Sequence, residues 1–511
     1  MSSMADKLAE REKSKEQARQ AGGKAAIRRQ HEQGKLTARE RIDLLVDPGS
    51  FQELDLLLTS AGDVLSPDKK SVPTDGVITG YAEVNSRPVF LWAQDATVLG
   101  GSVGVVHAKK ITAVMEKALQ ARVPIIGMVD SAGERAVDFL QYPHSYSLES
   151  MCQLQAMSSG VIPQIIMVMG PCPGSLAIST ALADFVFLVR NTSYMHVADP
   201  PPGVPPEELG AAWMHAKKTG CYDVFAENDT DCIEKCRGLL SYLPAHNGEM
   251  PPILDLGDSP DRREEELLTL VPEDVSKTFS MYRLISLIVD GGEFFELRRY
   301  WANNLVAGFA RFGGKVAAIL ANNPQNMGGC MTLDAADKMA RVVCFCDAFN
   351  IPIIWLADCP AFLPSVDEET RGLIRHGSKV IFANSMATVP QITVSIRKLY
   401  GGGGLAMPGT GLGGDLFVSW PVIARSTMGA EGAVSILYRG ELKAIDDEAA
   451  RKEQEKKRVA EMKHYLKLME QQQTQDFIDP RETRPFIIRA LKLLANKKQE
   501  LPPRKHSNIR L

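Results

Sequence analysis

Two glycine-containing stretches are the residues of this chain best suited to do chemistry. The strand-like run QIIMVMG leads to Gly174-Ser175 and then to an apolar helical segment, and LYGGGGLAM places residues 401–404 in a similar setting. Peptide N–H groups at a helix start lack intrahelical partners and carry the positive end of the helix dipole. Two such amides aimed at one point form an oxyanion hole, which stabilises an anion such as a thioester enolate. The sequence therefore predicts two anion-stabilising sites made from backbone.

An internal repeat relates the two stretches. The segment that starts at Arg87 aligns with the one that starts at Lys315, at a constant offset of 228 positions. Matching residues then coincide: Gly100 with Gly328, Pro124 with Pro352, and Asp130 with Asp358. A second block, VIPQIIMV with TVPQITVS, follows at an offset of 227. Gly174-Ser175 therefore falls on Gly401-Gly402 or on Gly402-Gly403, and the glycine stretches are matched sites.

The elements around these sites follow a regular alternation. Each copy alternates apolar β-rich runs with helical stretches, which is typical of βαβ units and of a sheet covered on both faces. This pattern predicts an α/β protein with two tandem homologous domains. We expect residues 1–260 to form the first domain, with a charged helical extension at its start, and residues 261–511 to form the second. A charged helix is expected at 446–472.

Composition limits the classes of function. The 511 residues are 45% hydrophobic and 23% charged, and the formal net charge is −4. These values favour a globular protein and argue against nucleic acid or an anionic membrane as the main partner. The first 40 residues lack an apolar core, and the nine cysteines are scattered in apolar surroundings. We therefore expect a cytoplasmic protein with reduced thiols, no membrane insertion and no metal site.

Several motifs together resemble one enzyme family. GKLTARERIDLLVDPGSF, VDSAGER, SGVIPQIIMVMGPCPG and ATVPQITVSIRKLYGG are similar to motifs of the carboxyltransferase (β) subunit of biotin-dependent acyl-CoA carboxylases, with the propionyl-CoA carboxylase branch closest. The resemblance covers about residues 30–511. It implies two crotonase-like (ββα superhelix) carboxyltransferase domains per chain. It also implies a homohexamer with active sites between the N-domain of one subunit and the C-domain of another.

The resemblance implies a reaction and a role for each glycine stretch. A carboxyl group moves from carboxybiotin to the α-carbon of an acyl-CoA through an enolate. The amides of Gly174 and Ser175 are expected to hold the thioester oxygen, and those of Gly402 and Gly403 the biotin ureido oxygen. Which hole serves which oxygen stays open. Substrate contacts are expected at a second set of positions: Ala132, Gly133, Gly404 and Leu405.

Two of these positions depart from the family pattern. The family's GGAYD motif is replaced by GGGGL, so Gly404 stands for a tyrosine and Leu405 for an aspartate that tunes acyl-chain choice. The change makes the pocket larger and apolar. We therefore expect an acyl group bulkier or more apolar than propionyl.

Other family functions are not visible in the chain. A biotin acceptor lysine lies between two methionines in a hairpin, and the only similar pair, Met462-Lys463, falls in the charged helix. No phosphate-binding loop or ATP-grasp segment is evident. Biotin must therefore be carried by another protein, and a biotin carboxylase and a biotin carboxyl carrier protein are the expected partners.

Three other functions remain open. The chain could be a subunit of a biotin-dependent acyl-CoA decarboxylase, which runs the half-reaction backwards, or a non-catalytic scaffold of a carboxylase complex. Glu134, near the first glycine stretch, could instead act as an acid or base in a hydratase or isomerase. Four histidines are further candidates, each more often structural than catalytic: His107, His144, His196 and His376.

Overall fold

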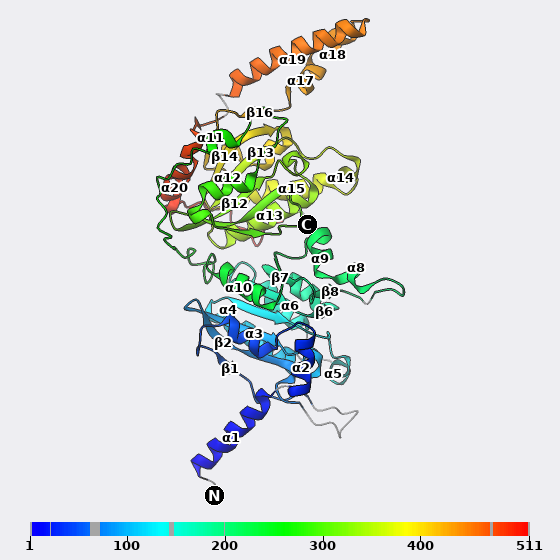
Figure 1. The fold of residues 1–511 in the computed structure, drawn as a ribbon, viewed down its shortest axis with the longest axis vertical. Coiled ribbons are helices and arrows are strands. Elements are labelled where there is room, and N and C mark those ends of the chain that lie inside the picture. Colours follow the sequence, from blue (N-terminus) through cyan, green and yellow to red (C-terminus); the bar gives the residue numbers. More distant parts are fainter. Residues whose placement is uncertain are drawn as a thin grey trace. The chain divides into compact units, whose positions relative to one another are not determined.

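The computed structural model describes residues 3–20, 22–61, 72–142, 148–198, 200–470 and 474–508. The chain divides into two compact units, Met1–Pro251 and Pro252–Leu511 (Figure 1). Each unit has its own mixed sheet with helices packed on it. No helix in the described ranges is long and apolar enough to cross a membrane.

Three helices precede the first sheet. They are α1 (Met4–Arg19), α2 (Lys24–Glu32) and α3 (Ala38–Leu45). The start of α3 is fixed by a capping box, in which the Thr37 side chain accepts from the Glu40 amide and the Glu40 carboxylate accepts from the Thr37 amide. Ile42 and Leu45 on α3 are buried. The helix is therefore anchored to the first unit by packing as well as by its cap.

The first sheet has seven strands in the order β1-β2-β3-β4-β5-β7-β9. The strands are β1 (Gln52–Leu54), β2 (Val77–Val84), β3 (Arg87–Gln94), β4 (Ile125–Val129), β5 (Gln164–Val168), β7 (Phe185–Val189) and β9 (Val224–Ala226). The first three pair antiparallel and the rest parallel. Every residue of β4, β5 and β7 is buried, as expected for parallel strands covered on both faces.

Helices and short elements complete this unit. They are η2 (Leu99–Gly101), α4 (Val105–Ala121), α5 (Ala136–Gln141), α6 (Leu148–Ser158), β6 (Pro171–Pro173), α7 (Ser175–Ala181), β8 (Tyr194–His196), α8 (Pro206–Gly210), α9 (Ala212–Met214) and α10 (Asp229–Leu240). Strands β6 and β8 form a separate parallel pair beside the entry to α7. This pair holds the turn that leads into α7.

The second unit contains an eight-stranded sheet in the order β10-β11-β12-β13-β14-β15-β17, with β16 beside β14. Its strands are β10 (Phe294–Leu297), β11 (Leu305–Phe312), β12 (Lys315–Asn322), β13 (Ile353–Cys359), β14 (Gln391–Tyr400), β15 (Leu416–Ser419), β16 (Ala424–Ser426) and β17 (Asp476–Phe477). Ile319 and Leu356 on the sheet share a buried core with Ile285 and Ile487 on the covering helices.

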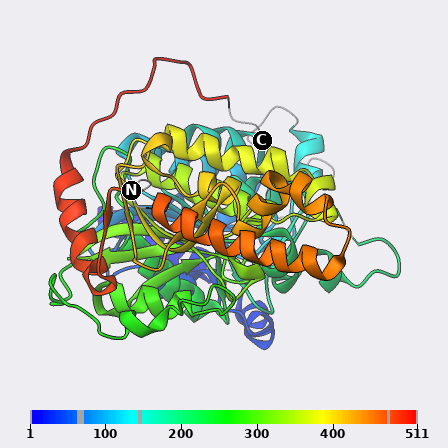
Figure 2. The same ribbon diagram turned by 90° about the horizontal axis from the view of Figure 1, so that it is seen from above.

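The helices of the second unit follow the same plan with additions. They are α11 (Leu267–Leu270), α12 (Met281–Ile288), α13 (Leu333–Ala348), α14 (Val366–Thr370), α15 (Leu373–Met386), α16 (Gly401–Ala406), α17 (Ala430–Leu437), α18 (Arg439–Lys443), α19 (Glu448–Glu470) and α20 (Thr483–Leu493). After α20 comes the short 3-10 helix η8 (Leu494–Asn496), and the rest of the described chain, drawn in red, continues without helix or strand (Figure 2).

The two sheets carry the same register as the sequence repeat. Strands β2, β3 and β4 begin 228 positions before β11, β12 and β13, and β5 begins 227 positions before β14. The short turn η2 has its counterpart in η5 (Met327–Gly329), and both begin with a non-glycine residue of positive φ, 51° at Leu99 and 49° at Met327. The equivalence therefore extends to the conformation of individual loop residues.

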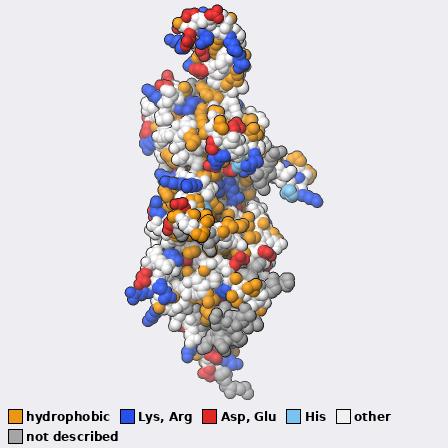
Figure 3. Space-filling model, turned by 90° about the vertical axis from the view of Figure 1, so that its right-hand side faces the viewer, with side chains coloured by type: hydrophobic (Ala, Val, Ile, Leu, Met, Phe, Trp, Pro, Cys, Tyr) orange, Lys and Arg blue, Asp and Glu red, His pale blue; other side chains and the backbone are white. Residues whose placement is uncertain are grey.

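Helices α17 to α19 form an arm on the second unit (Figure 1). The arm has a small core of its own, made by Ala433, Val434 and Met462. Side chains of both charge signs cover its surface (Figure 3). Met462-Lys463 lies inside α19, so it is not placed in a hairpin of the kind that presents a biotinylated lysine.

Candidate functional site

The first candidate loop follows β4. The Val103 amide donates to the Gly133 carbonyl (2.8 Å), and the Arg135 amide donates to the Val103 carbonyl (2.8 Å). Glu134 lies between these two bonds, and its own amide has no hydrogen-bond partner among the described residues. The Ala132 amide is used internally, because it donates to the Gly100 carbonyl (2.9 Å). The loop therefore offers one backbone donor, that of Glu134.

The second loop follows β5 and turns at Gly174 into α7. Gly174 has φ 67°, a conformation that glycine adopts readily, and its amide donates to the His196 carbonyl (2.8 Å). Ser175 begins α7, is exposed, and has an amide without a partner in the described part of the chain. A Cβ built on Gly133 would lie 3.0 Å from Cγ of Pro173, so the two loops touch. The Gly174 amide is engaged by its bond to the His196 carbonyl, so the expectation that it holds an oxyanion is corrected. The amides of Glu134 and Ser175, without partners among the described residues, belong to adjoining loops.

The second unit repeats the first loop with other side chains. The Met331 amide donates to the Ala361 carbonyl (2.9 Å), and the Leu363 amide donates to the Met331 carbonyl (2.8 Å). Phe362 stands where Glu134 stands in the first unit, and its amide likewise has no partner among the residues that the structure describes. The backbone donor is therefore kept while the side chain changes from a carboxylate to a ring.

The glycine run lies at the start of α16. Gly401 has φ 49°, like Gly174 at the equivalent turn, so the backbone favours the 227 register, with Gly402 opposite Ser175. The amides of Gly401, Gly402 and Gly403 have no partner within the described ranges. A Cβ on Gly403 would lie 3.0 Å from the Ala361 nitrogen, which places the run against the loop of Phe362. Glycine is required there because a side chain would displace that loop.

The remaining predicted substrate contacts lie around these loops. Ala132 is exposed and Gly133 is buried in the first unit. In the second unit Leu405 is 52% exposed, and a Cβ on Gly404 would lie 3.4 Å from Cγ of Leu399. The apolar side chain of Leu405 is thus presented on the surface of α16 beside the glycine run.

The other candidate side chains lie in both units, and most of them make structural contacts. Arg135 pairs with Asp75 (2.7 Å) and with Asp138 (3.2 Å), which anchors the end of the loop, and Glu134 is exposed. Nδ1 of His196 lies 3.0 Å from the Ala198 carbonyl, and Nδ1 of His376 lies 2.8 Å from the Asp337 carboxylate. His144 lies outside the described residues.

His107 is buried, and both of its ring nitrogens have hydrogen-bond partners. Its Nδ1 donates to the Asp75 carbonyl (2.9 Å), and its Nε2 accepts from the Gln94 amide (3.1 Å). Burial lowers the pKa of His107 from 6.5 to about 3. Below pH 6.5 His107 is protonated in the unfolded chain and stays neutral in the folded chain. The free energy of unfolding therefore falls as pH decreases.

We expect this fall to reach about 1.4 kcal/mol per pH unit between pH 6 and pH 4. Urea unfolding across that range measures it, with His107→Asn as the matched control, since asparagine keeps the donor to Asp75 and does not titrate. Equal pH slopes for the two proteins would contradict the assignment.

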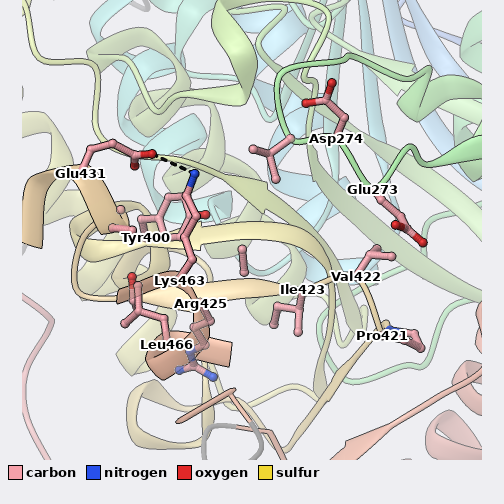
Figure 4. Close-up of a pocket in the computed structure, with 15 residues that line it drawn as sticks. Glu273, Asp274, Tyr400, Pro421, Val422, Ile423, Arg425, Glu431, Lys463 and Leu466 are labelled. Carbon is pink, nitrogen blue, oxygen red and sulfur yellow. Dashed lines mark ion pairs between the residues drawn. The ribbon is translucent and has the colours of Figure 1, made fainter. Parts of the chain in front are cut away.

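Two cavities border the loops. The one in the first unit has a volume of about 280 Å³ and lies between α2 and the ends of β4 and β5, where Arg29, Gln30 and Lys35 face Ser131 and Ala132. The one in the second unit has a volume of about 640 Å³ and is lined by Tyr400, the residue before the glycine run, as well as by residues of α19 (Figure 4). An ion pair between Lys463 and Glu431 (3.1 Å) closes part of its rim.

Comparison with known proteins identifies the class. The carboxyl transferase domain family matches residues 29–509, so the chain belongs to this family. The predicted family and α/β fold are thereby confirmed, as is the predicted class of enzyme, an acyl-CoA carboxyltransferase.

Particular relatives are named for two directions of carboxyl transfer. The chain is 41% identical to the methylmalonyl-CoA decarboxylase subunit alpha of Veillonella parvula, over 96% of each chain. It is 40% identical to the propionyl-CoA carboxylase beta chain of Roseobacter denitrificans, over 99% of this chain and 100% of that one. Among solved structures, the transcarboxylase 12S hexamer with methylmalonyl-coenzyme A bound matches with a TM-score of 0.95 at 37% identity, over 100% of this chain and 99% of that one.

Proposed function

We propose that this chain transfers a carboxyl group from biotin, carried by a partner protein, to the α-carbon of an acyl-CoA. The observation that carries the proposal is the duplicated pair of loops whose amides have no partner in the part of the chain that the structure describes, Glu134 with Ser175 and Phe362 with Gly402. Two such sites match a reaction in which two anions need stabilisation.

The first hole is the proposed site of the acyl thioester. The Ser175 amide, with that of Glu134 from the adjoining loop, donates to the thioester oxygen, while Gly174 supplies the left-handed turn that aims Ser175. As the α-proton leaves, negative charge develops on that oxygen, and preorganised donors stabilise it more than they stabilise the ground state. The cavity beside Ser131 and Ala132 supports this assignment, because Arg29, which lines it, is a partner for CoA phosphates.

The second hole is the proposed site of biotin. The amides of Gly402 and Gly403, with that of Phe362, fit the ureido oxygen. These donors have no partner among the described residues, and the glycines have no side chains to exclude a ring. When bound, carboxybiotin supplies the carboxyl group and its ureido ring takes up the charge left behind. The chain's own contribution is to hold that oxygen and orient the ring.

Partners and assembly follow from the same proposal. A biotin carrier and a biotin carboxylase are needed for net carboxylation, because this chain shows no biotin-accepting lysine in a suitable setting. The hexameric structure of transcarboxylase 12S supports a homohexamer. The composition and the scattered cysteines support a cytoplasmic location.

The second candidate function is the reverse reaction, decarboxylation of the CoA ester. The relative named methylmalonyl-CoA decarboxylase supports transfer from the CoA ester to biotin, and the relative named propionyl-CoA carboxylase supports the reverse. The same two holes serve both directions, because the transition states are shared.

The acyl preference is proposed to depend on Leu405. Its exposed apolar side chain beside the glycine run favours an acyl chain longer than propionyl, whereas aspartate there would disfavour apolar contact. We expect Leu405→Asp to move the preference in kcat/KM from longer acyl-CoA esters toward propionyl-CoA by about 10-fold, the worth of one apolar contact in a pocket. Leu405→Met is the control that keeps an apolar side chain. An unchanged ranking of esters in the aspartate variant would contradict the role of Leu405.

A panel of acyl-CoA esters tests the proposed function. The chain is co-purified with its biotin carboxylase and carrier and given ATP and labelled bicarbonate. The proposal predicts ATP-dependent incorporation of label into one or more esters. Absence of incorporation and of the reverse reaction with every ester would favour a scaffold role.

A further inference from the structure

A buried aspartate lies at the carboxyl end of the central strand of each sheet. Asp130 follows β4 and Asp358 lies near the end of β13, at equivalent positions of the repeat, and both are fully buried. Isolated buried carboxylates are costly, so each must be paired. In the two units, the cations that pair with this carboxylate come from different elements.

In the first unit the cations come from the segment that precedes the first sheet, Lys35 just before α3 and Arg41 on it. Asp130 accepts from Lys35 Nζ (2.9 Å), Gln30 Nε2 (2.7 Å) and Arg41 Nη1 (3.0 Å). Arg41 on α3 is itself fully buried, and its Nε donates to the carboxylate of Asp229 (2.7 Å). Two carboxylates and two cations therefore form a balanced buried group.

The third contact of Arg41 reaches the other loop. Its Nη2 donates to the Met169 carbonyl (3.1 Å), at the start of the segment that leads to Gly174 and Ser175. One rigid guanidinium thus joins the ends of β4 and β5, from which both loops of the first hole depart. Gly170 leaves room for this arrangement, because a Cβ there would lie 2.0 Å from Oδ1 of Asp130.

In the second unit the cation stands where Gly170 stands in the first. The 227 register places Gly170 on Arg397, whose Nη2 lies 3.3 Å from Oδ2 of Asp358. The Lys398 amide adds a hydrogen bond to Oδ1 of the same carboxylate (2.7 Å). The acid is kept in both copies, and the cation is supplied by the strand in one and by α3 in the other.

We propose that Arg41 is a positioning residue for the first oxyanion hole. It holds the loop of Glu134 and the loop of Ser175 at a fixed separation through Asp130 and Met169. This inference rests on the proposed function, which assigns the two amides to the thioester oxygen. It gives helix α3, which precedes the first sheet, a part in catalysis.

Arg41→Lys tests the proposal, because lysine keeps the charge and cannot reach Asp130, Asp229 and Met169 together. We expect kcat for carboxyl transfer from methylmalonyl-CoA to free biotin to fall about 100-fold, the cost of a displacement of about 1 Å, with KM for the ester changed much less. Amide hydrogen exchange should accelerate in residues 131–135 and 170–175. Arg39→Lys is the matched control, since Arg39 on the same helix makes a bidentate pair with Glu53 (3.0 Å for both contacts).

The outcomes separate this inference from the proposed function. A wild-type chain without transfer activity overturns the proposed function, while the exchange measurement still tests the tie between the loops. An active wild type with Arg41→Lys equal to Arg39→Lys in kcat and in loop exchange overturns the inference. Should Arg41→Lys not fold, Asp229→Asn is measured instead. This variant weakens the ion pair between Arg41 and residue 229, which belongs to neither loop. A smaller fall in kcat together with faster loop exchange supports the proposal, and unchanged values contradict it.

Discussion

Ser175→Pro should lower kcat for carboxyl transfer by about 100- to 1,000-fold, the usual cost of one oxyanion-hole donor. Proline removes the amide hydrogen and nothing else that the fold uses, because Ser175 is the first residue of α7 and its amide has no partner among the described residues. Proline is well tolerated at that helical position. Steady-state kinetics with methylmalonyl-CoA and free biotin measures the loss.

Ser175→Ala is the control for this prediction. It removes the exposed hydroxyl and keeps the amide, so its kcat should match that of the wild type. If both variants had the same kcat, the backbone of Ser175 would have no part in the reaction. Thermal unfolding of both variants shows whether α7 is retained.

The second large effect is expected at the glycine run. Gly402→Pro removes an amide in the first turn of α16, where no intrahelical bond is lost, and should also reduce kcat by about 100- to 1,000-fold. Gly402→Ala keeps the amide, although its Cβ would lie 3.1 Å from the Phe362 ring, so a small fall is expected. Because the second hole is assigned to biotin, the proline variant should fail with every acyl-CoA ester.

A different pattern would contradict that assignment. If Gly402→Pro lost activity only with longer esters and kept it with short ones, the run would contact the acyl chain instead of biotin. If its activity equalled that of Gly402→Ala, the amide of Gly402 would be dispensable.

Much of the fold could be predicted because buried parallel strands have a simple signature. The runs IIGMV and QIIMV are almost wholly apolar, and they form β4 and β5 with every residue buried. The repeat then related β4 to β13 and β5 to β14 without any structure. The expected charged helix at 446–472 corresponds to α19, Glu448–Glu470.

The details of the site could not be predicted from residue types. A free backbone amide has no side-chain signature, so Glu134 was considered only as an acid or base, and the amide of Phe362 was missed. Its place in the repeat, four residues after an aspartate that matches Asp130, was the available signal. The engagement of the Gly174 amide by His196 depends on the pairing of β6 with β8, which a three-residue strand does not reveal.

The buried contacts of Arg41 could not be predicted from the sequence either. They join residues 89 and 188 positions apart, and a basic residue on an amphipathic helix is ordinarily exposed. Only the folded arrangement shows that GKLTARER carries two cations into the interior.

The decisive experiment is an assay of biotin-dependent carboxyl transfer by the purified chain. Methylmalonyl-CoA labelled in its free carboxyl group is incubated with the wild type, Ser175→Pro and Gly402→Pro, each with and without free biotin. We expect the wild type to remove label from the ester only when biotin is present, and both variants to remove almost none. Loss of label that is independent of biotin, or equal in all three proteins, would contradict this expectation.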